Sequence, residues 1–174
     1  MFQVGALIVY GSTGVCRVED VRKMDPNGEN RERLYYILRP LFQDCTISIP
    51  VDQTRVFMRP VISRAEANAL IDRIPFMHAE PCHNRALHEL TEHYEAALRS
   101  HDCADLVELT MSIYAKKQYL EQHRRRFGAV DERFMKRAEQ LLFGELSAAL
   151  GIPISEVPQY ISARIGVQPD AAEA

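Results

Sequence analysis

A chain of 174 residues, 47% of them hydrophobic, is long enough to bury a core as one large or two small domains. No stretch reaches the roughly 18 unbroken apolar residues of a membrane span, and the start lacks a basic segment followed by an apolar one, so we expect a cytoplasmic protein without a membrane partner. The net charge of −3 argues against a protein that coats nucleic acid through bulk positive charge.

The first third of the chain has the pattern of short β-strands. An apolar run is closed by Gly11–Gly14, which predicts a first hairpin, and Asp25-Pro26-Asn27-Gly28 is a turn sequence that predicts a second. Five short, closely connected strands predict a small SH3-like or Tudor-like β-barrel. The five predicted strands span residues 7–10, 15–25, 34–38, 46–50 and 56–58, and the second is divided at Asp20 into the segments 15–20 and 21–25.

After Pro60 the hydrophobic period changes to that of α-helices. Ser63-Arg64-Ala65-Glu66 is a capping box, in which Ser and Glu each satisfy a free backbone donor at a helix start. Asp102 is a candidate N-cap and Gly151 a candidate C-cap, and a short helix is predicted over residues 155–161. Three amphipathic helices can bury their apolar stripes together. The stripes are Leu87, Leu90, Tyr94, Ala97 and Leu98; Leu106, Leu109, Ile113, Tyr114 and Leu120; and Phe134, Ala138, Leu141, Leu142 and Leu146.

These patterns predict an α+β multidomain chain. Residues 1–60 form the small β-barrel and residues 61–165 an all-α helical domain. The polar tail, residues 166–174, is expected to be disordered.

The cysteines are spread along the chain without a CxxC pair, which favours reduced thiols over a disulfide framework. One alternative is a zinc site, because several ligand types gather in one region. However, the histidines from 78 to 93 recur every five residues, which scatters them around a helix, so solvated histidines are the simpler interpretation and we expect no metal and no cofactor. The candidate zinc ligands are His78, Cys82, His83, His101 and Cys103.

An enzymatic function finds little support. Gly11–Gly14 is too short for a phosphate-binding loop and contains no lysine. The serines and cysteines lack a glycine-flanked nucleophile elbow, and acidic pairs such as Glu89 and Glu92 fit solvated helix faces. We therefore expect no catalytic residue and no small-molecule substrate.

Basic charge is concentrated in one part of the helical half. Residues 63–111 carry 4 basic and 9 acidic side chains, whereas residues 112–137 carry 8 basic and 3 acidic ones. By composition, a solvated basic face and a phosphate-contacting face are equally compatible with this segment. Its basic residues are Lys116, Lys117, Arg124, Arg125, Arg126, Arg133, Lys136 and Arg137.

Several segments resemble a known family. The N-terminal stretches are VGALIVYG at 4–11, GVC at 14–16, YYILRPL at 35–41, IPVD at 49–52 and VFMRP at 56–60. The helical stretches are AVDERF at 129–134, AEQLLFGEL at 138–146 and LGIP at 150–153. Together they resemble bacterial transcription regulators of the CarD and CdnL family, whose N-terminal module also occurs in the transcription-repair coupling factor.

The resemblance implies that the barrel binds the β subunit of bacterial RNA polymerase, largely through an exposed strand edge. Met24 and Ser48 stand where relatives carry arginines. By position, the implied polymerase contacts are Arg22, Lys23, Met24, Ile47, Ser48 and Arg55.

The resemblance also implies that the helical domain contacts the upstream edge of melting promoter DNA. Many relatives insert a tryptophan into the minor groove, but this chain has none, and His83 falls nearest that position. The implied DNA contacts are His83, Arg85, Lys116, Lys117, Arg124, Arg125, Arg126 and Arg133.

The sequence thus predicts a non-enzymatic regulator that binds RNA polymerase and biases promoter opening, located in the cytoplasm with the nucleoid. An alternative is a polymerase-binding adaptor whose helical domain contacts another protein rather than DNA. The missing tryptophan and the acidic segment 63–111 motivate this alternative.

Overall fold

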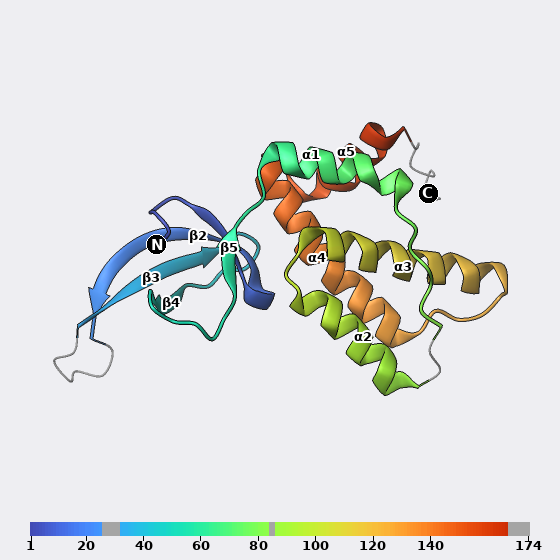
Figure 1. Ribbon diagram of the computed structural model, residues 1–174, viewed down its shortest axis with the longest axis horizontal. Helices are drawn as coiled ribbons and strands as arrows, with labels where there is room; N and C mark the ends of the chain where they lie inside the picture. Colours follow the sequence, from blue (N-terminus) through green and yellow to red (C-terminus); the bar gives the residue numbers. More distant parts are fainter. Residues whose placement is uncertain (26–31, 84–85, 167–174) are drawn as a thin grey trace. The chain divides into compact units, whose positions relative to one another are not determined.

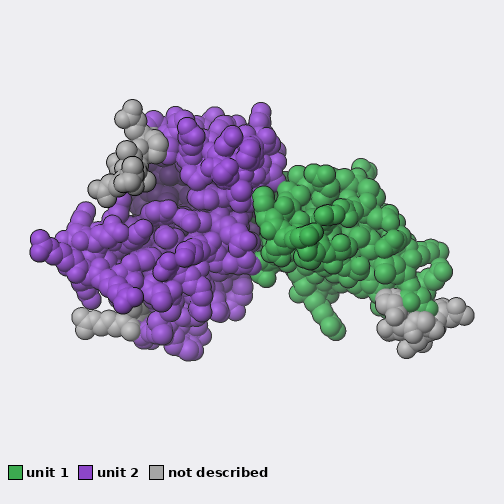
Figure 2. Space-filling view, turned by 180° about the vertical axis from the view of Figure 1, so that it is seen from behind, with its two compact units in different colours: residues 1–61 green, residues 62–174 purple. Residues whose placement is uncertain are grey.

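The computed structural model describes residues 1–25, 32–83 and 86–166 (Figure 1). The chain divides into two compact units, Met1–Val61 and Ile62–Ala174 (Figure 2). The first contains a five-stranded antiparallel sheet and the second contains helices, so the predicted α+β fold class is confirmed. The predicted turn at Pro26–Gly28, Arg85 and residues 167–174 of the predicted tail lie outside the described residues.

The sheet of the first unit has the strand order β4-β3-β2-β1-β5. Its two end strands, β4 and β5, are not paired with each other, and no strand among the described residues pairs with the outer edge of β4. The sheet surrounds one apolar core whose fully buried members include Ile8, Val18 and Leu38. The strands are β1 (Leu7–Tyr10), β2 (Gly14–Met24), β3 (Arg33–Pro40), β4 (Ile47–Pro50) and β5 (Met58–Pro60).

Two strands differ from the prediction. The segments on either side of residue 20 form one long strand, β2, because a bulge between Val18 and Asp20 lets pairing with β3 continue past the irregularity. The fifth strand lies two residues later than predicted and includes Pro60 opposite Ile8. Proline is tolerated there because β5 is an end strand, where one side needs no hydrogen-bond donor.

The second unit begins with the predicted capping box. The Ser63 Oγ accepts a hydrogen bond from the Glu66 N–H, and the Ser63 N–H donates to the Glu66 carboxylate. Asp102 caps the third helix, and Gly151 ends the fourth in the left-handed conformation, as predicted. The helices are α1 (Arg64–Arg73), α2 (Leu87–Arg99), α3 (Cys103–Gln122), α4 (Ala129–Leu150) and α5 (Val157–Ile165).

The helical unit has two apolar clusters. One joins α1 to the C-terminal half of α4 and to α5, and the other joins α2, α3 and the start of α4. The second cluster contains Leu90, Ile113 and Phe134, so the three predicted stripes do meet. Leu87 and Tyr114 were predicted to be buried but are 62% and 43% exposed, because they lie at the margins of their stripes.

No single helix in the described ranges is long and apolar enough to span a membrane. Only α4 and the segment Ile154–Ile165 reach that composition together, and they are bent by 103°.

Candidate functional site

The outer edge of β4 is open to an additional strand. The Val51 N–H donates to the Leu34 carbonyl on β3 at 2.9 Å. Because hydrogen-bonded residues alternate along an antiparallel strand, the backbone groups of residues 47, 49 and 51 point toward β3. By the same alternation, the backbone groups of Ser48 and Pro50 point away from β3. Proline has no N–H, so Ser48 supplies the one outward backbone N–H of β4.

The side chains of β4 leave this edge accessible. Ile49 is buried in the core and Ile47 is half-buried, whereas Ser48 is exposed. A partner strand beside β4 would therefore meet a small hydroxyl rather than a bulky side chain. The structure thus brings Ile47 and Ser48, two of the predicted polymerase contacts, to a free strand edge.

The predicted contacts on β2 lie across β3 from that edge. Arg22 is opposite Tyr35, which is opposite Pro50 of β4, so Arg22 and β4 are two strand spacings apart, about 10 Å. Met24 is half-buried at the end of the strand. β2 is an interior strand, so only its side chains can contact a partner.

The basic side chains near this edge are solvated. Arg22 lies 3.9 Å from Asp20, and Lys23 lies 3.7 Å from Glu32. Such exposed pairs contribute little stability, so either cation can exchange its partner for an acidic group on another protein. Arg55 is also exposed, in the loop between β4 and β5.

The loop that carries Arg55 is held by one glutamine. The Gln53 Nε2 donates to the Val56 carbonyl at 3.0 Å, and its Oε1 accepts from the Val56 N–H at 2.9 Å. These two hydrogen bonds close a loop of four residues, from Gln53 to Val56, and fix the backbone position of Arg55 within it.

Lys116 does not belong to the exposed basic surface that the sequence predicted. Its ammonium is buried and lies 2.8 Å from the Asp131 carboxylate, which also accepts a hydrogen bond from the Tyr94 hydroxyl at 2.7 Å. Burial, followed by the bond to Asp131, raises the pKa of Tyr94 far above its usual range. These three side chains join α3, α4 and α2, so Lys116 is occupied inside the unit.

The other described members of the predicted DNA surface are exposed, except Lys117, which is half-buried. Lys117 lies 4.0 Å from Glu121 on the same helix, and the guanidinium of Arg133 lies 5.0 Å from the ring centre of Phe134. Residues 124–126 follow the end of α3, and all three arginines are exposed. Cations at a helix C-terminus are favoured by the helix dipole.

One residue that sequence reasoning missed, Tyr119, lies between the rings of His83 and His123. The Tyr119 ring centre is 4.7 Å from that of His83 and 4.1 Å from that of His123. Tyr119 and His123 are four residues apart on α3, and this spacing alone predicts their contact. No local pattern in the sequence predicts the contact between His83 and Tyr119, because His83 comes from a different segment, the one before α2. We call these three residues the ring cluster.

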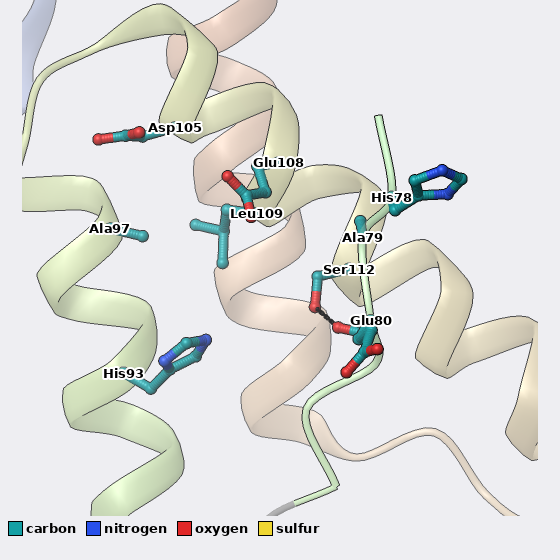
Figure 3. Close-up of a pocket in the computed structure, with 9 residues that line it drawn as sticks. All are labelled: His78, Ala79, Glu80, His93, Ala97, Asp105, Glu108, Leu109 and Ser112. Atoms are coloured by element: carbon teal, nitrogen blue, oxygen red, sulfur yellow. Dashed lines mark hydrogen bonds between the residues drawn. The ribbon is translucent and has the colours of Figure 1, made fainter. Parts of the chain in front are cut away.

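A pocket of about 520 Å³ lies between α2 and α3, and three of its nine lining residues are acidic (Figure 3). Figure 3 shows His93 projecting from α2 toward it, while the ring of His78 points away. Glu80, Asp105 and Glu108 line it. Among residues 1–25, 32–83 and 86–166, no three His, Cys, Asp or Glu side chains are grouped so as to hold a metal ion.

Comparison with known families adds the identity of the first unit. Residues 2–62 match the model of the CarD-like/TRCF RID domain, in which RID denotes an RNA polymerase-interacting domain. This family is a protein-interaction domain rather than a catalytic one, which indicates a transcription-associated role in binding polymerase. The N-terminal unit of this protein, which carries the β4 edge, thus matches the CarD-like/TRCF RID family over residues 2–62.

Proposed function

We propose that this protein is a non-enzymatic regulator of bacterial transcription that binds the β subunit of RNA polymerase and contacts promoter DNA to favour the open complex. Polymerase binding uses the β4 edge, and DNA binding uses the exposed cations of the helical unit. In this proposal the protein acts in the cytoplasm, on the nucleoid.

The observation that carries the proposal is the outward backbone of Ser48 on an open strand edge. A strand of the partner can pair with β4, with main-chain hydrogen bonds supplying affinity and neighbouring side chains supplying selectivity. Arg22 and Lys23 are exposed and can contact acidic groups flanking such a strand.

The DNA contact is local and electrostatic. Arg133 and the arginines at 124–126 are exposed and Lys117 is half-buried, whereas the protein as a whole has a net charge of −3. A few phosphate contacts give weak, salt-sensitive binding to free DNA. Tethering to polymerase raises the effective DNA concentration and makes this weak contact significant.

Promoter opening then needs no chemistry. A factor that binds the open complex more tightly than the closed complex shifts the equilibrium by the ratio of the two affinities. A tenfold ratio corresponds to about 1.4 kcal/mol, which two or three phosphate or base contacts made only in the open complex can supply.

Ser48→Pro tests the strand-pairing mode. Pro50 shows that the outward position of β4 accepts proline, so the change removes one outward donor and leaves the pairing with β3 intact. The full chain carrying Ser48→Pro should bind the polymerase β subunit about tenfold more weakly, because a partner carbonyl loses its donor.

Ser48→Ala is the matched control, because it removes the hydroxyl and keeps the backbone N–H. Its binding to the β subunit should equal that of the natural chain. Circular dichroism and thermal melting of both variants establish that the sheet is intact. Equal binding by a folded Ser48→Pro variant would rule out strand pairing through β4.

The acidic pocket favours a second candidate function, a polymerase-bound adaptor whose helical unit contacts a basic protein segment. Glu80, Asp105 and Glu108 line this pocket. Replacing Lys117, Arg124 and Arg125 with alanine separates the two functions. Loss of DNA crosslinking and a shorter promoter-complex lifetime support the DNA contact, whereas unchanged values with polymerase still bound support the adaptor.

A further inference from the structure

The ring cluster is an exposed aromatic surface that is built from two separate segments. Tyr119 is 40% exposed, and His83 and His123 are also exposed. The His83 and Tyr119 rings are tilted by 58°, and the Tyr119 and His123 rings by 31°. Three aromatic rings thus face solvent within one patch on α3 and the segment before α2.

A partly buried hydrogen bond fixes the segment that carries His83. The Ser112 Oγ donates to the Glu80 carbonyl at 2.6 Å (Figure 3), and Ser112 is only 8% exposed. His83 follows Glu80 by three residues, a distance along the chain that spans at most about 11 Å. Seven helical residues separate Ser112 from Tyr119 and rise by about 10.5 Å. The segment from Glu80 to His83 therefore runs alongside α3, and the hydrogen bond at Ser112 places the His83 ring against the Tyr119 ring.

His123 is also fixed. Its Nδ1 lies 2.7 Å from the Tyr119 carbonyl oxygen, and because a carbonyl only accepts, the Nδ1–H donates. In the neutral imidazole, Nε2 is then left as an acceptor for an outside donor. The ring orientation is therefore set before any ligand arrives, which lowers the entropic cost of binding.

Three arginines directly follow the ring cluster in the sequence. The end of α3 is a Schellman motif, in which the Arg125 N–H donates to the Leu120 carbonyl at 2.8 Å and the Arg124 N–H to the Glu121 carbonyl at 3.0 Å. Arg124 occupies the left-handed position, with φ of 52°. The motif turns the chain immediately after His123, and the three arginines that follow His123 in the sequence are exposed.

We propose that the ring cluster is a stacking platform for an unpaired base of single-stranded DNA, with the arginines at 124–126 holding the flanking phosphates. Exposed aromatic rings beside cations are the combination that binds single strands, because every base has a face that can stack. A duplex hides its base faces, so the platform acts once strands have separated. This inference rests on the proposed DNA contact and specifies its substrate.

Photo-crosslinking tests the proposal directly. The full chain is irradiated with a single strand of about 12 nucleotides that carries 5-iodouracil, and with the same sequence as a duplex. We expect a crosslink on the peptide that contains Tyr119 with the single strand and not with the duplex. A crosslink of equal yield from the duplex, or none from the single strand, would overturn the proposal.

Affinity measurements with matched variants supply the second readout. Tyr119→Leu keeps an apolar side chain but removes the ring, and should weaken single-strand binding about tenfold with duplex binding unchanged. Tyr119→Phe should restore the single-strand affinity. Equal losses on both DNA forms, or no loss on either, would contradict stacking.

A charge variant distinguishes this inference from the proposed function. Arg124→Gln with Arg125→Gln should weaken binding to single strand and duplex alike, because both carry phosphates. If only the charge variant affects DNA binding, the stacking platform fails while the DNA contact stands. If no variant affects DNA binding, the DNA half of the proposed function fails as well.

Discussion

The Nζ of Lys116 lies 2.8 Å from Oδ1 of Asp131 inside the helical unit, where the two side chains are 9% and 7% exposed. This pair joins α3 to the first turn of α4, and Tyr94 adds α2 through its hydrogen bond to the same oxygen. A buried ion pair is seldom worth more than a well-packed apolar pair, but the loss of one partner leaves a charge uncompensated.

Lys116→Met should therefore destabilise the helical unit by about 3–5 kcal/mol, because the Asp131 carboxylate stays buried without its cation. Urea denaturation followed by circular dichroism gives the free energy of unfolding. Adding Asp131→Leu to the same chain should recover most of the loss. A Lys116→Met variant of full stability but weaker DNA binding would show that Lys116 contacts DNA after all.

Tyr94 couples stability to alkaline pH. Burial first, and then the bond to Asp131, raise the pKa of Tyr94 above its usual 10.0. Above that pH the unfolded chain releases the phenol proton while the folded chain keeps it, so stability falls by up to about 1.4 kcal/mol per pH unit. Below pH 10.0 the Tyr94 hydroxyl adds no pH dependence to the free energy of unfolding.

Urea denaturation at about pH 9 and about pH 11 measures this effect as a difference between two chains. Tyr94→Phe keeps the packing and removes the titrating hydroxyl, so its stability should fall less between the two pH values than that of the natural chain. Identical falls would mean that Tyr94 ionises in the folded unit.

Arg124→Gly tests two properties of Arg124: its left-handed backbone conformation, through the stability of the protein, and its charge, through the affinity for DNA. Arg124 has φ of 52°, a conformation that glycine adopts without the steric cost of a Cβ, so the variant should be stabilised by about 0.5–1 kcal/mol. Its affinity for DNA should fall, and the slope of log K against log salt should decrease by about 0.9 if the contact is to duplex DNA.

Arg125→Gln is the matched control, because it removes a neighbouring charge without changing the strained position. It should show the same loss of affinity and no gain in stability. A gain in stability by both variants would assign the effect to relief of charge repulsion rather than to backbone conformation.

The cysteines report on the β4 edge. Burial, and then the nearby Cys45, raise the pKa of the Cys16 thiol to about 11, whereas Cys45 is exposed two residues before β4. Iodoacetamide at neutral pH should therefore modify Cys45 in the folded protein and leave Cys16 unmodified, because the thiolate is the reactive form. Mass spectrometry of the peptides measures both.

Polymerase binding at β4 should also slow the alkylation of Cys45, because a paired strand would cover the start of β4. Cys82, in the helical unit, serves as the internal reference. Full reactivity of Cys45 in the polymerase complex would place the contact elsewhere on the barrel.

Several features could be predicted from the sequence because they depend on neighbouring residues. The capping box of Ser63 and Glu66, the N-cap of Asp102 and the C-cap of Gly151 each satisfy backbone groups within a few residues. Hydrophobic periodicity likewise assigned the strands to the first unit and the helices to the second, since side-chain spacing follows backbone geometry.

The sequence by itself determined the α+β class, the helix caps at Ser63, Asp102 and Gly151 and the family match of residues 2–62, because these follow from local hydrogen bonding and residue order. Only the tertiary structure decided that Lys116 is buried against Asp131 rather than exposed, and that His83 meets Tyr119 through the segment anchored at Ser112. Both contacts join residues from different elements. Whether a charge or a ring faces solvent therefore depends on how the helices pack, which spacing along one element does not encode.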